Sequence, residues 1–158
     1  TEARSLAELI DFNRRNADRE LPLFGQEILE MAAAMGPLTD RAYLDAVAAL
    51  RRLVETEGLE PMFRDLRLDV LVAPGAGPAA LIDPLLGDRR ESSGPPLGSA
   101  AAIAGYPSIT LPMGLAKGMP VGMTVVAPGY AEDALLDIAA RFERESAFRV
   151  PPQPPAAA

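Results

Sequence analysis

The sequence predicts an α/β fold: a partial mixed β-sheet of about three strands, including a C-terminal hairpin, flanked by helices. An apolar run at 68–73 is rich in Val and Leu, as in strands that are buried on both faces. Farther along, an alternating strand at 108–113 and a return strand at 121–127 indicate a hairpin. Three strands are few for a self-sufficient sheet, which indicates that part of the sheet is missing.

The N-terminal region is expected to form two helices. Ser5 begins a capping-box pattern at 5–8, so a short helix should run from there to about Asn13. Residues 21–24 are expected to be a connection. A second helix is expected at 25–35, because apolar residues recur there at helical spacing before a Gly-Pro pair.

The third helix has the clearest pattern. Thr39 is suited to cap it, and four apolar residues recur at helical spacing: Tyr43, Val47, Leu50 and Val54. Gly58 is expected to lie just past its end, because glycine favours that position. A further turn or two of helix is expected at 59–66.

The second half is expected to alternate strands, loop and helices. Pro74 should end the first strand, and the Pro- and Gly-rich segment 74–98 should be a long irregular loop. Ser99 is expected to cap a helix that runs through Ala104. The last helix should begin near Glu132, where acidic residues favour the helix dipole.

Length and composition limit the organisation and the function classes. The chain of 158 residues is expected to form one domain over 1–150, with a disordered Pro/Ala-rich tail at 151–158. The first residue is not Met, which indicates a piece of a longer chain. A net charge of −7 argues against a nucleic-acid partner. Neither a transmembrane run nor a signal peptide is found, and the absence of Cys favours the cytoplasm.

The chain holds few groups that could catalyse a reaction. It has no His and no Cys, which excludes a Ser-His-Asp triad, a Cys-His pair and a conventional zinc site, and no cofactor is expected. The single lysine, Lys117, lies in a Gly-rich stretch that reads as the exposed turn of the hairpin. A catalytic lysine needs burial to lower its pKa. We therefore predict no catalytic residue and no metal ligand in this chain.

Several segments resemble a known family when they are taken in order. They lie at 5–13, 21–27, 68–74, 82–84 with 87–88, 101–114, 120–123, 135–136 and 142–143. Each segment is weak by itself, but the ordered set resembles the C-terminal part of the amidase signature family. The likeness covers nearly the whole chain.

The resemblance implies an enzyme that hydrolyses or transfers amide groups. Family members have a mixed sheet between helical layers and a triad of Ser, a second Ser with a cis peptide bond, and Lys. The resemblance also implies that the triad lies upstream of the region seen here. This chain would then be the C-terminal portion of an amidase for a small-molecule amide: it would supply fold and pocket wall and be inactive alone.

Three positions bear on the substrate pocket through this resemblance. The loop between the first strand and the Gly-Tyr-Pro motif tends to approach the acyl side of the pocket, where Asp83 and Ser99 match polar positions. The alternative is that Asp83 stabilises its own turn and that Ser99 only caps a helix. Gly75 stands where relatives often carry Thr, which could change the shape of the pocket rim.

Other interpretations are weaker or different in kind. Ser92-Ser93-Gly94 superficially resembles a nucleophile segment, but prolines follow it, so a flexible loop is favoured. A nucleotide-binding turn at 73–77 lacks the third glycine and the helix that should follow. The alternative function is a non-enzymatic stand-alone binding or assembly module. In either case the isolated piece is expected to self-associate through exposed apolar faces, without a membrane partner.

Overall fold

The computed structural model describes residues 3–88 and 97–151 of the chain. Contacts between residues divide the chain into two compact units, Thr1–Asp45 and Ala46–Ala158. The single domain expected over 1–150 stays a prediction. Most of the proposed C-terminal tail lies outside the described residues.

The first unit contains α1 (Leu6–Arg15), α2 (Ala17–Glu20) and α3 (Glu27–Ala33). The Ser5 hydroxyl accepts a hydrogen bond from the Glu8 backbone N–H at 3.2 Å, so the predicted cap is confirmed. The prediction of a second helix is also confirmed, although the helix is shorter at both ends than 25–35. The short helix α2 was not predicted.

Two side chains join α1 to the start of α3. Asn13 Nδ2 donates to Gln26 Oε1 at 3.1 Å, and Gln26 Nε2 donates to the Ile10 carbonyl at 3.2 Å. Gln26 is only 8% exposed, so these bonds satisfy a buried amide. Asn13 and Gln26 belong to two of the family-like segments, and this contact gives both a structural role.

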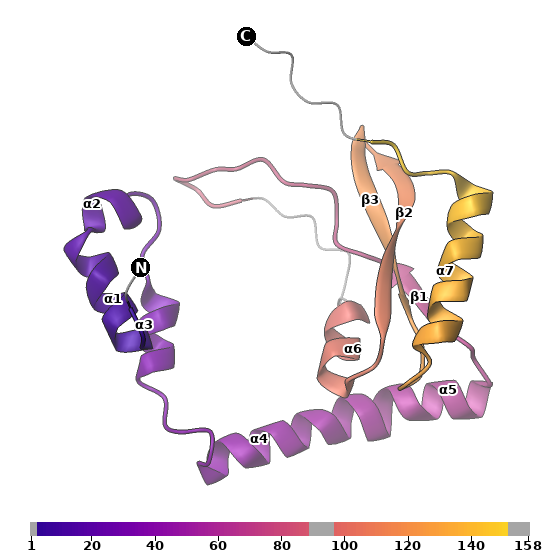
Figure 1. Cartoon of the computed structure of the whole chain (residues 1–158), viewed down its shortest axis with the longest axis horizontal. Helices are drawn as coiled ribbons and strands as arrows, with labels where there is room; N and C mark the ends of the chain where they lie inside the picture. Colours follow the sequence, from indigo (N-terminus) through magenta and orange to yellow (C-terminus); the bar gives the residue numbers. More distant parts are fainter. Residues whose placement is uncertain (1–2, 89–96, 152–158) are drawn as a thin grey trace. The chain divides into compact units, whose positions relative to one another are not determined.

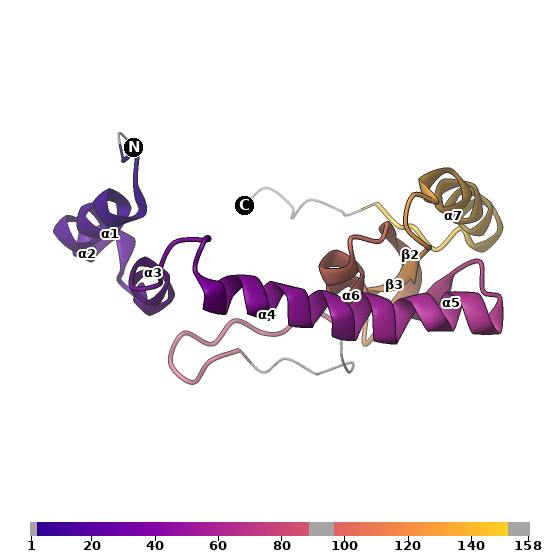
Figure 2. The same cartoon turned by 90° about the horizontal axis from the view of Figure 1, so that it is seen from below.

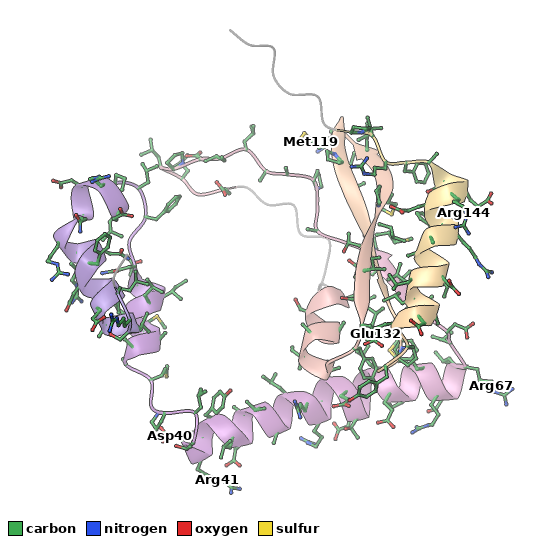
Figure 3. All side chains as sticks on the ribbon, viewed as in Figure 1. Asp40, Arg41, Arg67, Met119, Glu132 and Arg144 are labelled. Carbon is green, nitrogen blue, oxygen red and sulfur yellow. The ribbon has the colours of Figure 1, made fainter. Side chains whose placement is uncertain are left out.

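A long helical run follows, made of α4 (Arg41–Arg51), the π-helical segment η1 (Arg52–Leu59) and α5 (Glu60–Leu66). Figure 2 shows it as one continuous ribbon, and Figure 3 labels Arg41 and Arg67 at its two ends. It ends at Arg67, which has a left-handed backbone (φ 53°).

Two predicted boundaries of this run are wrong. Gly58 lies inside the run and does not end it. A Cβ at Gly58 would lie 2.9 Å from the Leu53 carbonyl oxygen, so glycine permits a close backbone approach within the π-helical turns. The ring of Pro61 just downstream would clash with a regular helical turn, which favours the widened geometry before it. At the other end, Asp40 immediately precedes the helix in place of Thr39.

The sheet has strand order β1-β3-β2, from β1 (Leu71–Pro74), β2 (Ser108–Ala116) and β3 (Met119–Val126). Both pairings are antiparallel, so the described strands do not form the mixed sheet that was expected. The sheet is antiparallel because of the position of β3. A two-residue turn brings β3 back beside β2, and β1 pairs with the other edge of β3. Lys117 and Gly118 form that turn with positive φ angles of 53° and 79°, as favoured hairpin turns require. The predicted hairpin is confirmed.

The prediction that the first strand is buried on both faces is wrong for this chain. The strand begins at Leu71, includes Pro74 and lies at the edge of the sheet. Leu71 packs into a core cluster, whereas Val72, on the opposite face, is 58% exposed. Val70, just before the strand, still packs against the core cluster that contains Leu135 and Ala139, so the exposure on that face begins at Val72.

Helices lie on both faces of the sheet (Figure 1). On one face, Leu135 and Ala139 of α7 (Glu132–Ser146) pack against Leu111 and Val125. The other face is covered by α6 (Leu97–Ala104) together with η1 and α5. There, Ala101, Leu59, Phe63 and Val126 form a second buried cluster. The second unit is therefore an α/β structure with an antiparallel sheet.

Figure 3 labels Glu132 and Arg144 at opposite ends of α7, in its first and last turns. Acidic residues begin this helix and a basic residue lies near its end, as the sequence predicted. None of the helices that the structure describes is long and apolar enough to span a bilayer.

Candidate functional site

Asp83 organises its own turn in the loop after β1. Its Oδ1 accepts hydrogen bonds from the backbone N–H groups of Leu85 at 3.1 Å and Leu86 at 2.9 Å. Its own N–H donates to Asp88 Oδ1 at 3.0 Å. These bonds are those of an Asx turn, so Asp83 does stabilise its own turn, as one of the two alternatives for this residue expected.

Asp83 also lines an open hollow of about 480 Å³ between this loop and the tip of the β2–β3 hairpin. Figure 3 labels Met119 at that tip. The lining residues are Pro78, Ala79, Ala80, Leu81, Asp83, Lys117 and Met119. The carboxylate of Asp83 and the ammonium group of Lys117 therefore border an otherwise largely apolar wall. The sequence alone did not predict that these two residues would lie at the same hollow.

The described lining of the hollow brings no set of catalytic groups together. Lys117 is exposed at the hairpin turn, as predicted, and is not buried as a catalytic lysine would be. Among the described lining residues there is no Ser, Thr, Tyr or Cys to act as a hydroxyl or thiol nucleophile. The described lining carries one charge of each sign, Asp83 and Lys117, beside apolar side chains.

Ser99 lies elsewhere, as the third residue of α6, and its side chain is exposed. The expectation that it caps this helix is wrong, because α6 already begins at Leu97. Leu97 packs against the cluster of Leu59 and Phe63, and that contact supports a start two residues before Ser99. Among the described residues, Ser99 does not line the hollow that Asp83 borders.

Beside the start of α6 lies a compact group of small residues, the glycine–threonine cluster: Gly75, Gly98, Thr110, Gly122 and Thr124. The two threonine hydroxyl oxygens lie 3.4 Å apart on neighbouring strands, and Thr124 is only 7% exposed. Sequence analysis missed this cluster, although register-matched threonines on paired strands are a signal for it.

Gly75 brings the loop backbone close to this cluster. Its N–H donates to the Gly122 carbonyl at 2.7 Å. A Cβ on Gly75 would lie 3.0 Å from that carbonyl oxygen and 3.5 Å from Thr124 Oγ1. A threonine at this position would therefore require a local shift of the neighbouring atoms. The effect of Gly75 on the shape of the pocket rim stays a prediction.

The Gly-Tyr-Pro motif follows the end of α6 and positions the aromatic ring of Tyr106. Gly105 has φ 73°, and the Tyr106 N–H donates to the Ala101 carbonyl at 2.9 Å, which completes a Schellman-type end. The Tyr106 ring lies 5.9 Å from that of Phe63, centroid to centroid. Burial raises the pKa of the Tyr106 phenol, and the nearby carboxylates of Glu55 and Glu60 raise it further.

Two other sequence interpretations can be placed. Ser92, Ser93 and Gly94 lie outside the described residues. After the proposed nucleotide-binding turn at 73–77 no helix follows directly, because the described chain is irregular through Asp88. In the part of the chain that the structure describes, no cluster of three or more His, Cys, Asp or Glu side chains could hold a metal ion.

Comparison with known proteins relates the whole chain to one family. The sequence profile of the family described as "Amidase" matches residues 2–136. A probable amidase of Arabidopsis thaliana is 29% identical over 95% of this chain, which spans 26% of that protein. A glutamyl-tRNA(Gln) amidotransferase subunit of Streptococcus equi subsp. zooepidemicus is 33% identical over 65% of this chain and 21% of its own length.

Solved structures show the same relation in three dimensions. The native peptide amidase of Stenotrophomonas maltophilia matches with a TM-score of 0.83 and 41% identity, over 97% of this chain and 30% of that one. A structure of the peptide amidase PAM with the competitive inhibitor chymostatin matches equally well, with a TM-score of 0.83 and 39% identity.

An amidase family protein from Bacillus anthracis matches with a TM-score of 0.75 and 25% identity, over 96% of this chain and 26% of that one. The chain thus spans less than a third of the length of each of these relatives. The ordered motifs, the family profile and the shared fold lead to one conclusion: the chain belongs to the amidase signature family.

Proposed function

We propose that this chain is the C-terminal portion of an amidase that hydrolyses an amide C–N bond. It supplies part of the fold and a wall of the substrate pocket, and it supplies no catalytic group. One observation carries the proposal: almost the whole chain, 97%, superposes on only 30% of the peptide amidase from Stenotrophomonas maltophilia. The chain behaves as a segment of a larger catalytic fold.

Amide hydrolysis requires groups that this chain does not assemble. A nucleophile must attack the carbonyl carbon, a base must take its proton, and N–H donors must stabilise the oxyanion. Lys117 is the only lysine, and it is exposed at a hairpin turn. In the family mechanism, an upstream serine attacks, the amine departs with a proton, and water then releases the acyl group from the serine.

For the substrate we propose a peptide amide or a similar small amide. Support comes from the peptide amidase relatives, one of which was crystallised with the competitive inhibitor chymostatin. The net charge of −7 favours a substrate other than nucleic acid. The absence of Cys is compatible with the cytoplasm, which we propose as the compartment.

A stand-alone binding or assembly module is the second candidate. It is favoured by the loop after β1, in which Leu81 is 89% exposed and Leu85 is 93% exposed. Large apolar side chains exposed in this way are typical of surfaces that bind another polypeptide. This function would need no catalytic partner.

A chimera separates the two candidates. The upstream part of the Stenotrophomonas maltophilia peptide amidase is joined to this chain in place of its own matching segment, and ammonia release from a peptide amide is measured. The amidase proposal expects turnover by the chimera and none by this chain alone. Turnover by this chain alone would contradict it. So would a folded chimera that binds the peptide amide but does not cleave it.

The same chimera tests the two residues that the family resemblance places at the substrate pocket, Asp83 and Ser99. Asp83→Asn and Ser99→Ala are each expected to raise KM severalfold and to leave kcat nearly unchanged, because a wall residue binds substrate without reacting. Asp137→Asn, at an exposed position of α7, is the matched control. If KM is the same for all three variants, Asp83 and Ser99 have structural roles only.

A further inference from the structure

The apolar residues of the long helical run fall into two regular series. Val47, Leu50 and Val54 are spaced by three and four residues, as one face of an α-helix requires. Leu59 and Phe63 continue with the same kind of spacing. The step between the two series, from Val54 to Leu59, is five residues. In a regular α-helix, side chains five residues apart point about 140° away from each other, so the two series would face different ways.

The structure places the end of the first series and the start of the second on the same face. Val54 is partly buried and packs against the core cluster that contains Leu59, Phe63 and Ala101. Figure 2 shows α6, which carries Ala101, beside the middle of the run, where it contacts η1. The π-helical turns of η1 allow this arrangement, because such turns pair residues that are five apart.

Polar contacts in η1 follow the same spacing of five residues. Arg52 Nη1 lies 2.6 Å from Glu57 Oε1, whereas ion pairs on an α-helix join residues three or four apart. The Glu60 N–H donates to the Glu55 carbonyl. After burial, the carboxylates of Glu55 and Glu60 are the groups that raise the pKa of the Tyr106 phenol, so both lie near it. The widened spacing is therefore present in the backbone, in an ion pair and in the groups around Tyr106.

We propose that η1 is a register device: it holds one residue more than a regular helix needs, and so aligns the series that ends at Val54 with the series that begins at Leu59. Without this residue of slack, regular spacing from Val54 would direct Glu57 or Gly58 toward the core cluster. The device serves the packing of the run on α6 and the sheet. It does so whether or not the chain takes part in amide hydrolysis.

Pro61 offers a second cause for the widened turns. In a regular helix its ring would clash with the carbonyl four residues earlier. The two causes differ in what they predict for Pro61→Ala. A proline effect alone would let this variant return to a regular helix. The register device keeps the π-helical turns in the variant, because burial of both Val54 and Leu59 still requires them.

Deletion of one residue tests the register device. Each protein in the comparison carries Pro61→Ala, so that a regular helix is sterically allowed. Thr56 is an exposed residue of η1, and its deletion shortens the step from Val54 to Leu59 to four residues. The folding equilibrium constant, measured by urea unfolding, should rise or stay within about threefold of that of the undeleted protein, because no buried contact is lost.

Deletion of Asp137 is the matched control. Asp137 is also exposed, and it lies between the buried residues Leu135 and Ala139 on α7, which is a regular α-helix. Because α7 has no residue to spare, this deletion turns one of the two buried residues away from the core. The folding equilibrium constant should therefore fall at least about tenfold.

Gly58→Ala gives a second readout, whose sign depends on the geometry of the turns. With Thr56 present, the new Cβ would lie 2.9 Å from the Leu53 carbonyl oxygen, so the substitution should lower the folding equilibrium constant. With Thr56 deleted, residue 58 lies inside a regular helix. There the same substitution should raise the constant about two- to fivefold, as is usual for glycine in a helix interior.

Two results would overturn the register device: a loss of folding after deletion of Thr56 as large as that after deletion of Asp137, or an effect of Gly58→Ala with the same sign in both proteins. The chimera described above, carrying the same changes, repeats the comparison if the isolated chain aggregates. Unfolding is measured there without regard to activity, so an inactive chimera contradicts only the amidase proposal. Failure of the Thr56 deletion to fold in both the isolated chain and the chimera also overturns the device.

Discussion

At the scale of single residues, glycines set how closely the backbone approaches its neighbours in the glycine–threonine cluster. A Cβ on Gly122 would lie 2.6 Å from Thr110 Cγ2, which is closer than packed carbon atoms allow. Rotation of Thr110 away from a new side chain would move its hydroxyl from its place 3.4 Å from that of Thr124. The methyl group of Thr110 therefore occupies the place that a side chain at residue 122 would need.

Replacement of Gly122 by alanine should destabilise the fold. We expect Gly122→Ala to cost about 1–3 kcal/mol of unfolding free energy, the usual range for overpacking. Thr110→Ser removes the clashing methyl group and keeps the hydroxyl, so it should recover at least half of that cost. Urea unfolding of the two single variants and the double variant measures the coupling. Additive effects would contradict the proposed clash.

The ionisation of Tyr106 makes the free energy of unfolding depend on pH in the alkaline range. Its pKa is raised in the folded chain, first by burial and then by Glu55 and Glu60. The unfolded chain therefore loses this proton at a lower pH than the folded chain does. This contribution to stability is complete below about pH 10, the ordinary value for tyrosine, and is lost as pH rises through the higher folded pKa.

The prediction is that Tyr106→Phe flattens the fall in stability above about pH 10, because phenylalanine cannot ionise. Thermal unfolding between neutral pH and about pH 11 measures it. Tyr130 is 99% exposed, so Tyr130→Phe is the matched control and should follow the parent chain. Identical pH profiles for all three proteins would refute the assignment.

At the scale of elements, the run from α4 to α5 departs from a regular helix at η1. The N–H of Glu60 bonds to the Glu55 carbonyl, five residues back, as in a π-helix. The same widened spacing lets Leu53 and Gly58 approach closely. Leu59 and Phe63, beyond this point, are buried in the core cluster. The irregular turns therefore precede the part of the run that packs on the sheet.

Two Gly→Ala substitutions in helices should have opposite effects. In an ordinary helix interior this change stabilises by about 0.5–1 kcal/mol. Gly58→Ala should instead destabilise, because its Cβ would meet a backbone oxygen at 2.9 Å. Gly98→Ala in α6 would meet only Thr124 Cγ2 at 3.9 Å, so it should be neutral or stabilising. Chemical unfolding compares them, and stabilisation by Gly58→Ala would refute the steric argument.

At the scale of the whole molecule, much apolar surface is exposed in each unit. The first unit buries Ile10 and Gln26 among its described residues, and it leaves Ile28 81% exposed. The second unit exposes an apolar loop patch made of Leu81, Ile82, Leu85 and Leu86. A protein stable by itself rarely exposes so many large apolar residues, and these surfaces fit a segment of a larger fold.

The isolated chain is therefore expected to self-associate through this loop patch. Light scattering after size-exclusion chromatography should show a mass that rises with concentration. It should also rise with added salt, because salt screens repulsion between copies that each carry −7. Leu85→Gln with Leu86→Gln should reduce the mass, and Leu136→Gln on α7 is the control. A monomer at all concentrations would contradict the prediction.

The sequence by itself determined the features that depend on near neighbours along the chain. Ser5 caps its helix, the hairpin turns at Lys117-Gly118, and α7 carries opposite charges at its ends, as predicted. Local periodicity and turn chemistry fix these features within a few residues. The ordered motifs also identified the family.

Only the tertiary structure decided which distant segments meet. It placed β3 between β1 and β2, which made the described sheet antiparallel. It brought Asp83 and Lys117 to one hollow and left Ser99 apart from them. It also kept Gly58 within a helix and exposed Val72 at an edge. The physical reason is that burial and strand order depend on non-local packing, whereas sequence periodicity reports only which residues share a face.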